Sequence, residues 1–233
     1  MSAPFAPPKG MVIHPELVQG SDEWLAARRG HLTASEMKLI VTPKLKQAAN
    51  DKERTHLFEL LAQRITGYVE PQYVSDDMLL GVENEFYARQ AYTEHYAPVE
   101  TVGFITNDKW GFTLGYSPDG LVGDEGLIEC KSRRQKFQIQ TIADDEVPAD
   151  YMIQLQTGLL VSEREWIDFI SYSGGLPMFV KRVEPIPEYQ EAIIAAATAF
   201  EARIGDKWLA YNSSLASRKL IPTERRVEAE MHI

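Results

Sequence analysis

Two short motifs in the middle of the chain carry the side chains best suited to chemistry. The first is Pro118-Asp119-Gly120, and the second is Glu129-Cys130-Lys131 at the end of an apolar run. Because side chains alternate across a β-strand, Glu129 and Lys131 should point to one face and Cys130 to the other, where it acts as a small buried hydrophobe. Two charged groups on one face of an apolar strand are costly to bury unless something compensates them.

A divalent cation between Asp119 and Glu129 would compensate both carboxylates. Mg²⁺ suits this arrangement, because it binds one or two carboxylates and keeps several water ligands. Lys131 would then position or deprotonate an attacking water, with its ammonium pKa lowered by the metal and by desolvation. The alternative is a surface salt bridge between Glu129 and Lys131, which is the better interpretation of Glu-X-Lys taken alone. The full order of Pro-Asp, loop, apolar strand and Glu-X-Lys is much more specific.

Composition narrows the class of protein. The chain has 233 residues, of which 44% are hydrophobic and 25% are charged, as in ordinary globular proteins. It has no apolar run of about 18 residues, so we expect no transmembrane helix, and residues 1–10 lack the apolar core of a secretory signal. A single cysteine indicates a reducing compartment. The formal net charge of −10 means that any contact with nucleic acid must be local.

Periodicity predicts an α/β chain in which no internal linker stands out. We expect one domain over residues 1–233, with an irregular lead at 1–18 and a C-terminal tail at 210–233. Helices are expected at 21–29, from a Thr33–Glu36 capping box toward Val41, and at 57–67, 76–96, 133–142, 150–161 and 187–209. Extended segments are expected at 100–106, 111–116, 126–131, 166–171 and 178–183, with a loop at 120–126. The buried stripe of the last helix should comprise Tyr189, Ile193, Ala197, Phe200, Ile204 and Trp208.

The two central motifs resemble the halves of the PD-(D/E)XK nuclease superfamily. More closely, the chain resembles the phage lambda exonuclease family of viral recombination nucleases. Three further motifs carry this resemblance, in the order of that family. They are residues 19–36 with Trp24, Arg28 and Ser35, residues 81–89 with Glu85, and Tyr151-Met152-Ile153-Gln154-Leu155-Gln156. The rest of the chain beyond them shows no motif.

The resemblance implies a restriction-endonuclease-like α/β core, in which helices flank a central mixed β-sheet. It implies a Mg²⁺-dependent exodeoxyribonuclease, with Mn²⁺ as a substitute, that digests double-stranded DNA 5′→3′ from 5′-phosphorylated ends. The remaining 3′ single strands would serve phage-type recombination by strand annealing. The resemblance also implies a ring-shaped homotrimer, a single-strand annealing protein as partner, no membrane partner, and the cytoplasm of a bacterial host cell.

The resemblance assigns roles to individual residues. Asp119, Glu129 and the backbone carbonyl of Cys130 would hold the metal, and Lys131 would activate the water. Glu85 would supply a further carboxylate. Periodicity alone does not choose between Glu85 and Glu83, which lies on the other apolar face of the same expected helix, but the spacing from Gly81 favours Glu85.

The same resemblance suggests how DNA is held. Arg28 presents a planar fork suited to phosphate, and Ser35 is expected in the first turn of a helix, so together they would bind a terminal 5′-phosphate. Gln154 and Gln156 cannot both face the site from one helix; Gln154 is favoured, and Tyr151 shares its face. Further candidates for DNA contact, each of which could instead shape a turn or lie on a solvated surface, are Ser117, Arg133, Arg134, Lys136 and Gln156.

Two other functions remain open from the sequence. One is a structure- or sequence-specific endonuclease of the same superfamily, which would cut a closed circular duplex. The other is a non-catalytic DNA-binding module that has kept the fold. The complete set of Asp119, Glu129 and Lys131 argues against the second, since such a module need not keep all three.

Overall fold

Two four-stranded mixed sheets lie at the centre of the computed structural model, which describes residues 10–71 and 75–225. In the first sheet β2 is parallel to β4 and the other pairs are antiparallel; its order is β1 (Met11–His14), β3 (Phe104–Asn107), β4 (Leu114–Tyr116) and β2 (Leu32–Thr33). In the second sheet β6 is parallel to β7 and the outer pairs are antiparallel; its order is β5 (Gly120–Val122), β6 (Gly126–Ser132), β7 (Trp166–Tyr172) and β8 (Phe179–Val183).

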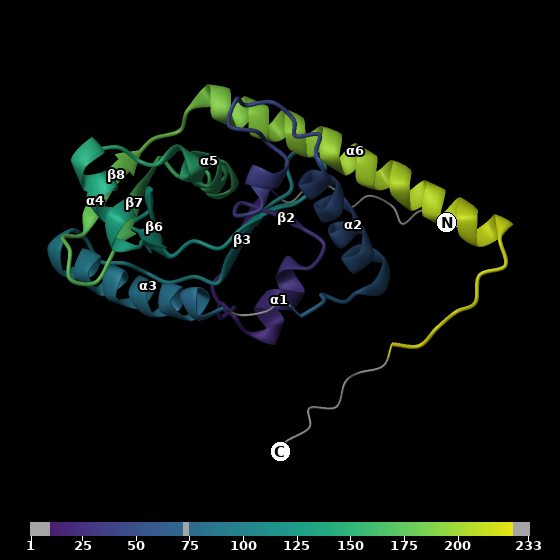
Figure 1. Ribbon diagram of the computed structural model, residues 1–233, viewed down its shortest axis with the longest axis horizontal. Helices are drawn as coiled ribbons and strands as arrows, with labels where there is room; N and C mark the ends of the chain where they lie inside the picture. Colours follow the sequence, from purple (N-terminus) through teal and green to yellow (C-terminus); the bar gives the residue numbers. More distant parts are fainter. Residues whose placement is uncertain (1–9, 72–74, 226–233) are drawn as a thin grey trace, which may run out of the picture.

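Helices cover both faces of the second sheet, so the expected α/β class is confirmed. Figure 1 shows α3 (Asp76–His95) on one side of β6 and β7 and α5 (Ala149–Ser162) on the other. The remaining helices are α1 (Asp22–Arg28), α2 (Asp51–Thr66), α4 (Gln135–Asp144) and α6 (Pro187–Ser217). In the described ranges, no helix is both long enough and apolar enough to cross a membrane.

Strand β6 is buried on both faces for most of its length, and this places the candidate residues. Ile128 and Cys130 pack on the α3 side, with Ala88 and Tyr92 of that helix. Leu127 points the other way, into the larger core that α5 and α6 complete. The alternation of a strand therefore sends Glu129 and Lys131 toward α5 and Cys130 toward α3, as the sequence predicts.

Local signals explain several helix ends. Ser21 caps α1 by accepting a hydrogen bond from the Trp24 backbone N–H, and Asn50 caps α2 by accepting from the Glu53 N–H. Helix α2 ends at Gly67, whose φ of 65° lies in the left-handed region that glycine adopts most easily.

Three expectations about local structure are wrong. Residues 33–41 do not form an α-helix: Leu32–Thr33 is β2, paired with β4, and only Met37–Leu39 is a 3₁₀ helix. The Thr33 hydroxyl donates to the Glu36 carboxylate at 2.6 Å instead of capping a helix, because pairing with β4 holds Thr33 in a strand. Residues 11–14 of the expected lead form β1, and 120–122 of the expected loop form β5.

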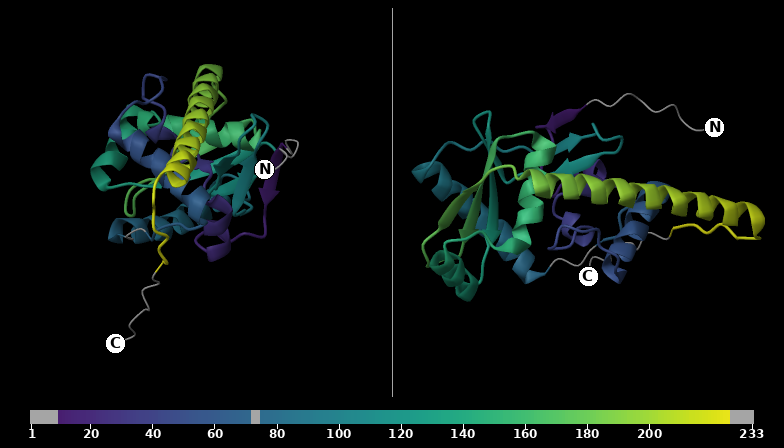
Figure 2. Two further views of the ribbon diagram at one scale, coloured as in Figure 1. Left: turned by 90° about the vertical axis from the view of Figure 1, so that its right-hand side faces the viewer. Right: turned by 90° about the horizontal axis from the view of Figure 1, so that it is seen from above.

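The last helix is longer than its pattern predicts. Ile193, Ala197, Phe200 and Ile204 are buried as expected, but Trp208 is 49% exposed and the helix continues through Ser217. Figures 1 and 2 show why: α6 runs out past the sheets, so its second half leaves the core that covers the first. Residues 1–9 of the expected lead (1–18) and residues 226–233 of the expected tail (210–233) lie outside the described residues.

A pair of substitutions in α6 tests this division. Ile193→Ala removes a fully buried side chain and should lower the free energy of unfolding by about 2–5 kcal/mol. Leu209→Ala changes a side chain that is 61% exposed and should alter stability by less than about 0.5 kcal/mol. Chemical denaturation monitored by circular dichroism measures both, and equal losses would contradict the placement of α6.

Candidate active site

Strand pairing brings the two acidic motifs together at one end of the second sheet. Gly120 pairs with Ile128, which places Asp119, just before β5, opposite Glu129 of β6. One Asp119 oxygen accepts a hydrogen bond from the Cys130 backbone N–H at 2.6 Å, and both carboxylates are buried. They open on a cavity of about 210 Å³ lined by Trp24, Arg28, Ala34, Ser35, Tyr116, Ser117, Asp119, Glu129, Lys131 and Gln154.

Glu129 is the most heavily hydrogen-bonded side chain of this site. Its Oε1 accepts from the Lys131 ammonium at 2.7 Å and from the Gln154 amide at 2.5 Å. Its Oε2 accepts from the Tyr116 hydroxyl at 2.8 Å. The Glu129–Lys131 ion pair considered from the sequence therefore exists, but in a buried setting, since Glu129 is only 2% exposed. Sequence reasoning did not identify Tyr116; its only signal is its place directly before Ser117.

The structure distinguishes between the two candidate glutamates of α3. Glu83 is exposed, whereas Glu85 is partly buried and lies close enough to Asp119 to raise the pKa of that carboxyl. Glu85 also forms an i, i+4 ion pair with Arg89, at 2.9 Å. Its charge is therefore partly neutralised within the helix, and it is a secondary member of the acidic cluster.

Burial dominates the electrostatics of the cluster. It raises the pKa of Asp119 well above its usual range, and Glu129 and Glu85 raise it further against the opposing effect of Lys131. Burial likewise raises the pKa of Glu85, opposed by Arg89. For Lys131 burial alone would lower the pKa, but the adjacent Glu129 and Asp119 outweigh it and the pKa is raised. The expectation of a lowered lysine pKa was made for a site that holds a metal, so it stays a prediction.

The donor set fits a hard divalent cation. Two buried carboxylates face one lysine, so negative charge remains that a cation would compensate. No group of three or more His, Cys, Asp or Glu side chains is arranged as a metal site in residues 10–71 and 75–225. What the chain offers is a carboxylate pair, and this number of carboxylates suits Mg²⁺ better than a metal that needs a full set of protein ligands.

The cavity is also lined by the partly buried guanidinium of Arg28. Arg28 stacks 4.4 Å from the centre of the Trp24 ring and donates to the Ser117 hydroxyl at 3.1 Å. Trp24 donates its indole N–H to the same hydroxyl at 3.0 Å. Burial lowers the pKa of Arg28, opposed by Glu36. The Arg28 fork is thus held in place by its neighbours. One of them is Trp24, which belongs to the first motif of the resemblance but was given no role there.

Ser35 is close to Arg28 but not for the reason expected. It lines the cavity and its hydroxyl lies 3.4 Å from that of Thr33, to which Arg28 donates at 3.3 Å. Ser35 precedes a 3₁₀ helix of three residues, not the first turn of an α-helix. Any anion here would be bound by side chains and not by a row of helical N–H groups.

Gln156 does not belong to the site, contrary to its listing among the DNA-binding candidates. It is fully buried; its amide donates to the Glu184 carbonyl at 2.8 Å and its side-chain oxygen accepts from the Ile186 N–H at 2.7 Å. It therefore fixes the start of α6. The two-residue offset that separates it from Gln154 on the helix is the physical reason.

The basic residues after β6 lie at the edge of the site. Arg133 donates to the Tyr151 hydroxyl at 2.7 Å, and the Lys131 ammonium lies 5.6 Å from the centre of the same ring. Tyr151 therefore sits between the catalytic candidate and the first of the basic residues. Arg134 and Lys136 are exposed on the first turn of α4 and its approach.

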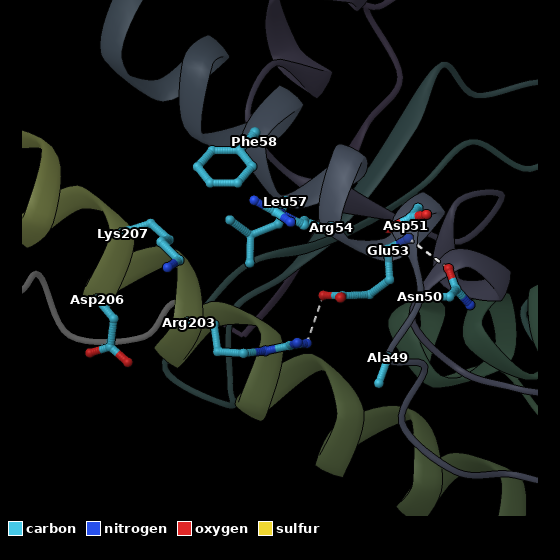
Figure 3. Close-up of a pocket in the computed structure, with 10 residues that line it drawn as sticks. All are labelled: Ala49, Asn50, Asp51, Glu53, Arg54, Leu57, Phe58, Arg203, Asp206 and Lys207. Atoms are coloured by element: carbon cyan, nitrogen blue, oxygen red, sulfur yellow. Dashed lines mark hydrogen bonds and ion pairs between the residues drawn. The ribbon is translucent and has the colours of Figure 1, made fainter.

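A larger cavity, of about 500 Å³, lies between α2 and α6 (Figure 3). Its buried acid, Glu53, points toward Arg203 across the cavity and forms an ion pair with it at 2.7 Å. The buried charge is therefore already compensated by the protein itself. In the smaller cavity two buried carboxylates face a single lysine, so their charge is only partly compensated. The smaller cavity is therefore the better candidate for catalysis.

Comparison with known proteins agrees with this geometry. Residues 23–165, more than half of the chain, match the family described as the YqaJ-like viral recombinase domain. The chain belongs to this family. A search of curated proteins found no match.

Solved structures give the same answer. An alkaline exonuclease (LHK-Exo) from Laribacter hongkongensis is 32% identical with a TM-score of 0.70, over 84% of this chain and 100% of that chain. LHK-Exo in complex with dAMP gives 33% and 0.71 over the same shares. A phage related exonuclease from Haemophilus somnus 129PT, at 13% identity and a TM-score of 0.50 over 76% of this chain and 96% of its own, shares the fold alone. These matches indicate a nuclease with a PD-(D/E)XK-like fold.

The raised pKa of Asp119 predicts an unusual effect of removing its charge. A carboxyl whose pKa is higher in the folded than in the unfolded state contributes less stability as the pH rises above its ordinary value of about 4. Asp119→Asn should therefore be more stable than the wild type in EDTA at pH 7. The gain should shrink toward pH 4.

Thermal unfolding between pH 4 and 8 measures this difference. Asp206→Asn, at an exposed position of α6, is the matched control and should leave stability nearly unchanged at every pH. A variant at position 119 that is less stable than the wild type at pH 7 would contradict an uncompensated buried charge.

Proposed function

We propose that the chain is a Mg²⁺-dependent exodeoxyribonuclease that digests double-stranded DNA 5′→3′ from 5′-phosphorylated ends. The observation that carries the proposal is the convergence of Asp119, Glu129 and Lys131 on a cavity that Arg28 also lines. The related Laribacter enzyme is an exonuclease and binds dAMP, a nucleoside monophosphate of the kind that such a reaction releases.

The metal would be held by Asp119, Glu129 and the Cys130 carbonyl, with Glu85 bound directly or through water. Mg²⁺, or Mn²⁺ in its place, would stabilise negative charge on the phosphate and on the leaving 3′-oxygen. Gln154 would serve by holding Glu129, because its amide donates to the carboxylate.

Lys131 orients and activates the water that attacks phosphorus. Its ammonium is anchored to Glu129 at 2.7 Å and is still 23% exposed, so one face of the group meets the cavity. Its raised pKa keeps it charged when it faces the acids alone. A cation that shares the negative charge of these acids would lower that pKa toward the range in which lysine can accept a proton.

The part of the cavity around Arg28 supports selection of the DNA end. Arg28 presents two N–H groups of a planar fork, already aligned by Ser117 and Thr33, which suits a terminal 5′-phosphate. Ser35 and Ser117 add hydroxyls beside it. Arg133, Arg134 and Lys136 would follow the DNA backbone beyond the site, with Tyr151 between them and Lys131.

The biological setting follows from the family. The 3′ single strands left by digestion would be used in phage-type recombination, with a single-strand annealing protein as partner, in the cytoplasm of a bacterial host. A ring-shaped homotrimer around the DNA would make digestion processive. These assignments rest on the likeness to viral recombination nucleases.

Substitution of the lysine tests the chemistry. Lys131→Ala should lower the rate of nucleotide release by about 10²- to 10⁴-fold, the usual contribution of a positioned acid or base, while DNA binding persists. Linear duplex labelled at the 5′ or the 3′ end, incubated with Mg²⁺ or EDTA, gives the rate, the direction and the metal dependence together.

Lys109→Ala is the control for that experiment, because Lys109 forms a surface ion pair with Glu163 away from the site. Wild-type turnover by the position-131 variant would remove lysine from the mechanism. Cutting of a closed circular duplex by the wild type would show an endonuclease instead.

The phosphate pocket gives a second prediction for activity. Arg28→Ala should slow digestion of 5′-phosphorylated ends by about 10-fold or more, since hydrogen bonds to charged groups are worth about 1.5–3 kcal/mol. Ends with a 5′-hydroxyl should be affected much less. Arg28→Lys keeps the charge but loses the fork and should recover only part of the rate; equal losses on both kinds of end would argue against a phosphate pocket.

A further inference from the structure

Tyr116 joins the two sheets at the active site. It is the last residue of β4 in the first sheet, it is only 1% exposed, and its hydroxyl donates to Oε2 of Glu129 in the second sheet at 2.8 Å. The carboxylate that carries the proposed metal site is therefore held from its own strand by Lys131 and from the other sheet by Tyr116.

The ring of Tyr116 also sets the approach of α5. A Cβ atom at position 158 would lie 2.8 Å from Cζ of the ring, closer than such atoms come to one another in proteins. Helix α5 can lie this near the ring because residue 158 is glycine. Gln154 is one turn earlier on the same helical face, and its amide reaches Glu129 Oε1 at 2.5 Å.

These contacts form a closed arrangement around one carboxylate. Tyr116 fixes Oε2 through its hydroxyl, and through its ring it fixes the helix whose Gln154 holds Oε1. Both donors are neutral, so they orient the carboxylate without cancelling its charge and leave oxygen lone pairs for a cation. Lys131 differs, because its ammonium would repel a cation placed at the same carboxylate.

We propose that Tyr116 is a positioning residue, which holds Glu129 in the orientation that binds a divalent cation, and that Gly158 is required for it to do so. The proposal rests on the proposed function of Glu129 as a metal ligand. Groups that orient a metal ligand typically change metal affinity by about 10- to 100-fold when removed. Tyr116→Phe, which keeps the ring and removes only the hydroxyl, should therefore weaken Mn²⁺ binding by about 10-fold or more.

The chain supplies a matched control. Tyr92 is also 1% exposed, and its hydroxyl donates to a buried carboxylate, Asp168 Oδ2, at 2.7 Å. Asp168 pairs with Arg182 and does not line the cavity. Tyr92→Phe removes the same atom from the same kind of contact, so it should reduce stability to a similar extent without changing metal affinity.

Binding of Mn²⁺ to the intact protein without DNA is measured from the free-ion electron paramagnetic resonance signal, and thermal unfolding is recorded beside it. We expect weaker binding for Tyr116→Phe and wild-type binding for Tyr92→Phe. Equal Mn²⁺ affinities in the wild type and Tyr116→Phe would overturn the proposal, and so would equal weakening in both variants.

A second pair of variants tests the role of the glycine. Gly158→Ala should displace the ring and weaken Mn²⁺ binding, whereas Gly205→Ala, in α6, has open space around its added methyl and should bind normally. Because Gly158→Ala acts through Tyr116, the double variant with Phe at position 116 should lose less affinity than the product of the two single losses. Wild-type Mn²⁺ binding by Gly158→Ala would overturn its part in the proposal.

Activity separates this proposal from the proposed function. If the proposed function holds, Tyr116→Phe should digest DNA slowly at low Mn²⁺ and recover at high Mn²⁺, whereas a variant that is merely unfolded would not recover. If the wild type bound Mn²⁺ but digested no DNA, the nuclease function would fail while the effect of Tyr116 on binding still stood or fell by its own measurement.

Discussion

The burial of two carboxylates side by side is the constraint on which the rest of the site depends. Asp119 and Glu129 lie opposite each other, Asp119 just before β5 and Glu129 in the middle of β6, whose two faces are both covered. Water would normally share such charge, and here it is largely excluded. The surrounding residues donate hydrogen bonds to both Glu129 oxygens and to one Asp119 oxygen, while net negative charge is kept that would suit a hard cation.

Some neighbours of the two carboxylates compensate their charge, and others only orient them. Lys131 supplies the positive charge that stabilises the two buried carboxylates when no metal is bound. The carboxylates in turn raise the pKa of Lys131. Tyr116, Gln154 and the Cys130 N–H supply only direction. Glu85 stands further back, since Arg89 already takes part of its charge. A site built in this way is pre-organised for the proposed cation, because little would have to move for the cation to bind.

Around Arg28 the cavity follows the same principle with a positive charge: neighbouring residues hold one charged group in place. Arg28 is partly buried and stacked on Trp24, so its charge lies in a setting of reduced polarity, where it would attract an anion more strongly than a fully exposed arginine. Under the proposed function, anionic DNA would be drawn to this local positive charge on a chain whose net charge is −10. The acidic remainder disfavours contact elsewhere.

The features that could be predicted from the sequence are those that depend on interactions between residues close together in the chain. The helices at 76–95 and 149–162 and the strand at 126–132 follow from local periodicity, and the sequence predicts them to within a few residues. The supposed helix at 33–41 fails because pairing of Thr33 with Gly115, far along the chain, overrides a local capping signal. The prediction that Trp208 is buried is wrong, because periodicity describes the apolar face of a helix but not how far the core extends along that face.

By itself the sequence indicated the residues that we propose to carry the chemistry. Asp119, Glu129 and Lys131 stand out by their types, their order and the alternation of side chains along a strand, which are local properties, and Arg28 stands out by the resemblance to a known family. Only the tertiary structure decided which neighbours act on them: that Glu85 and not Glu83 faces the acids, that Gln156 is structural, and that Tyr116 spans the two sheets. Those outcomes depend on contacts between segments far apart in the chain, and no local pattern of residues encodes the distance between two elements.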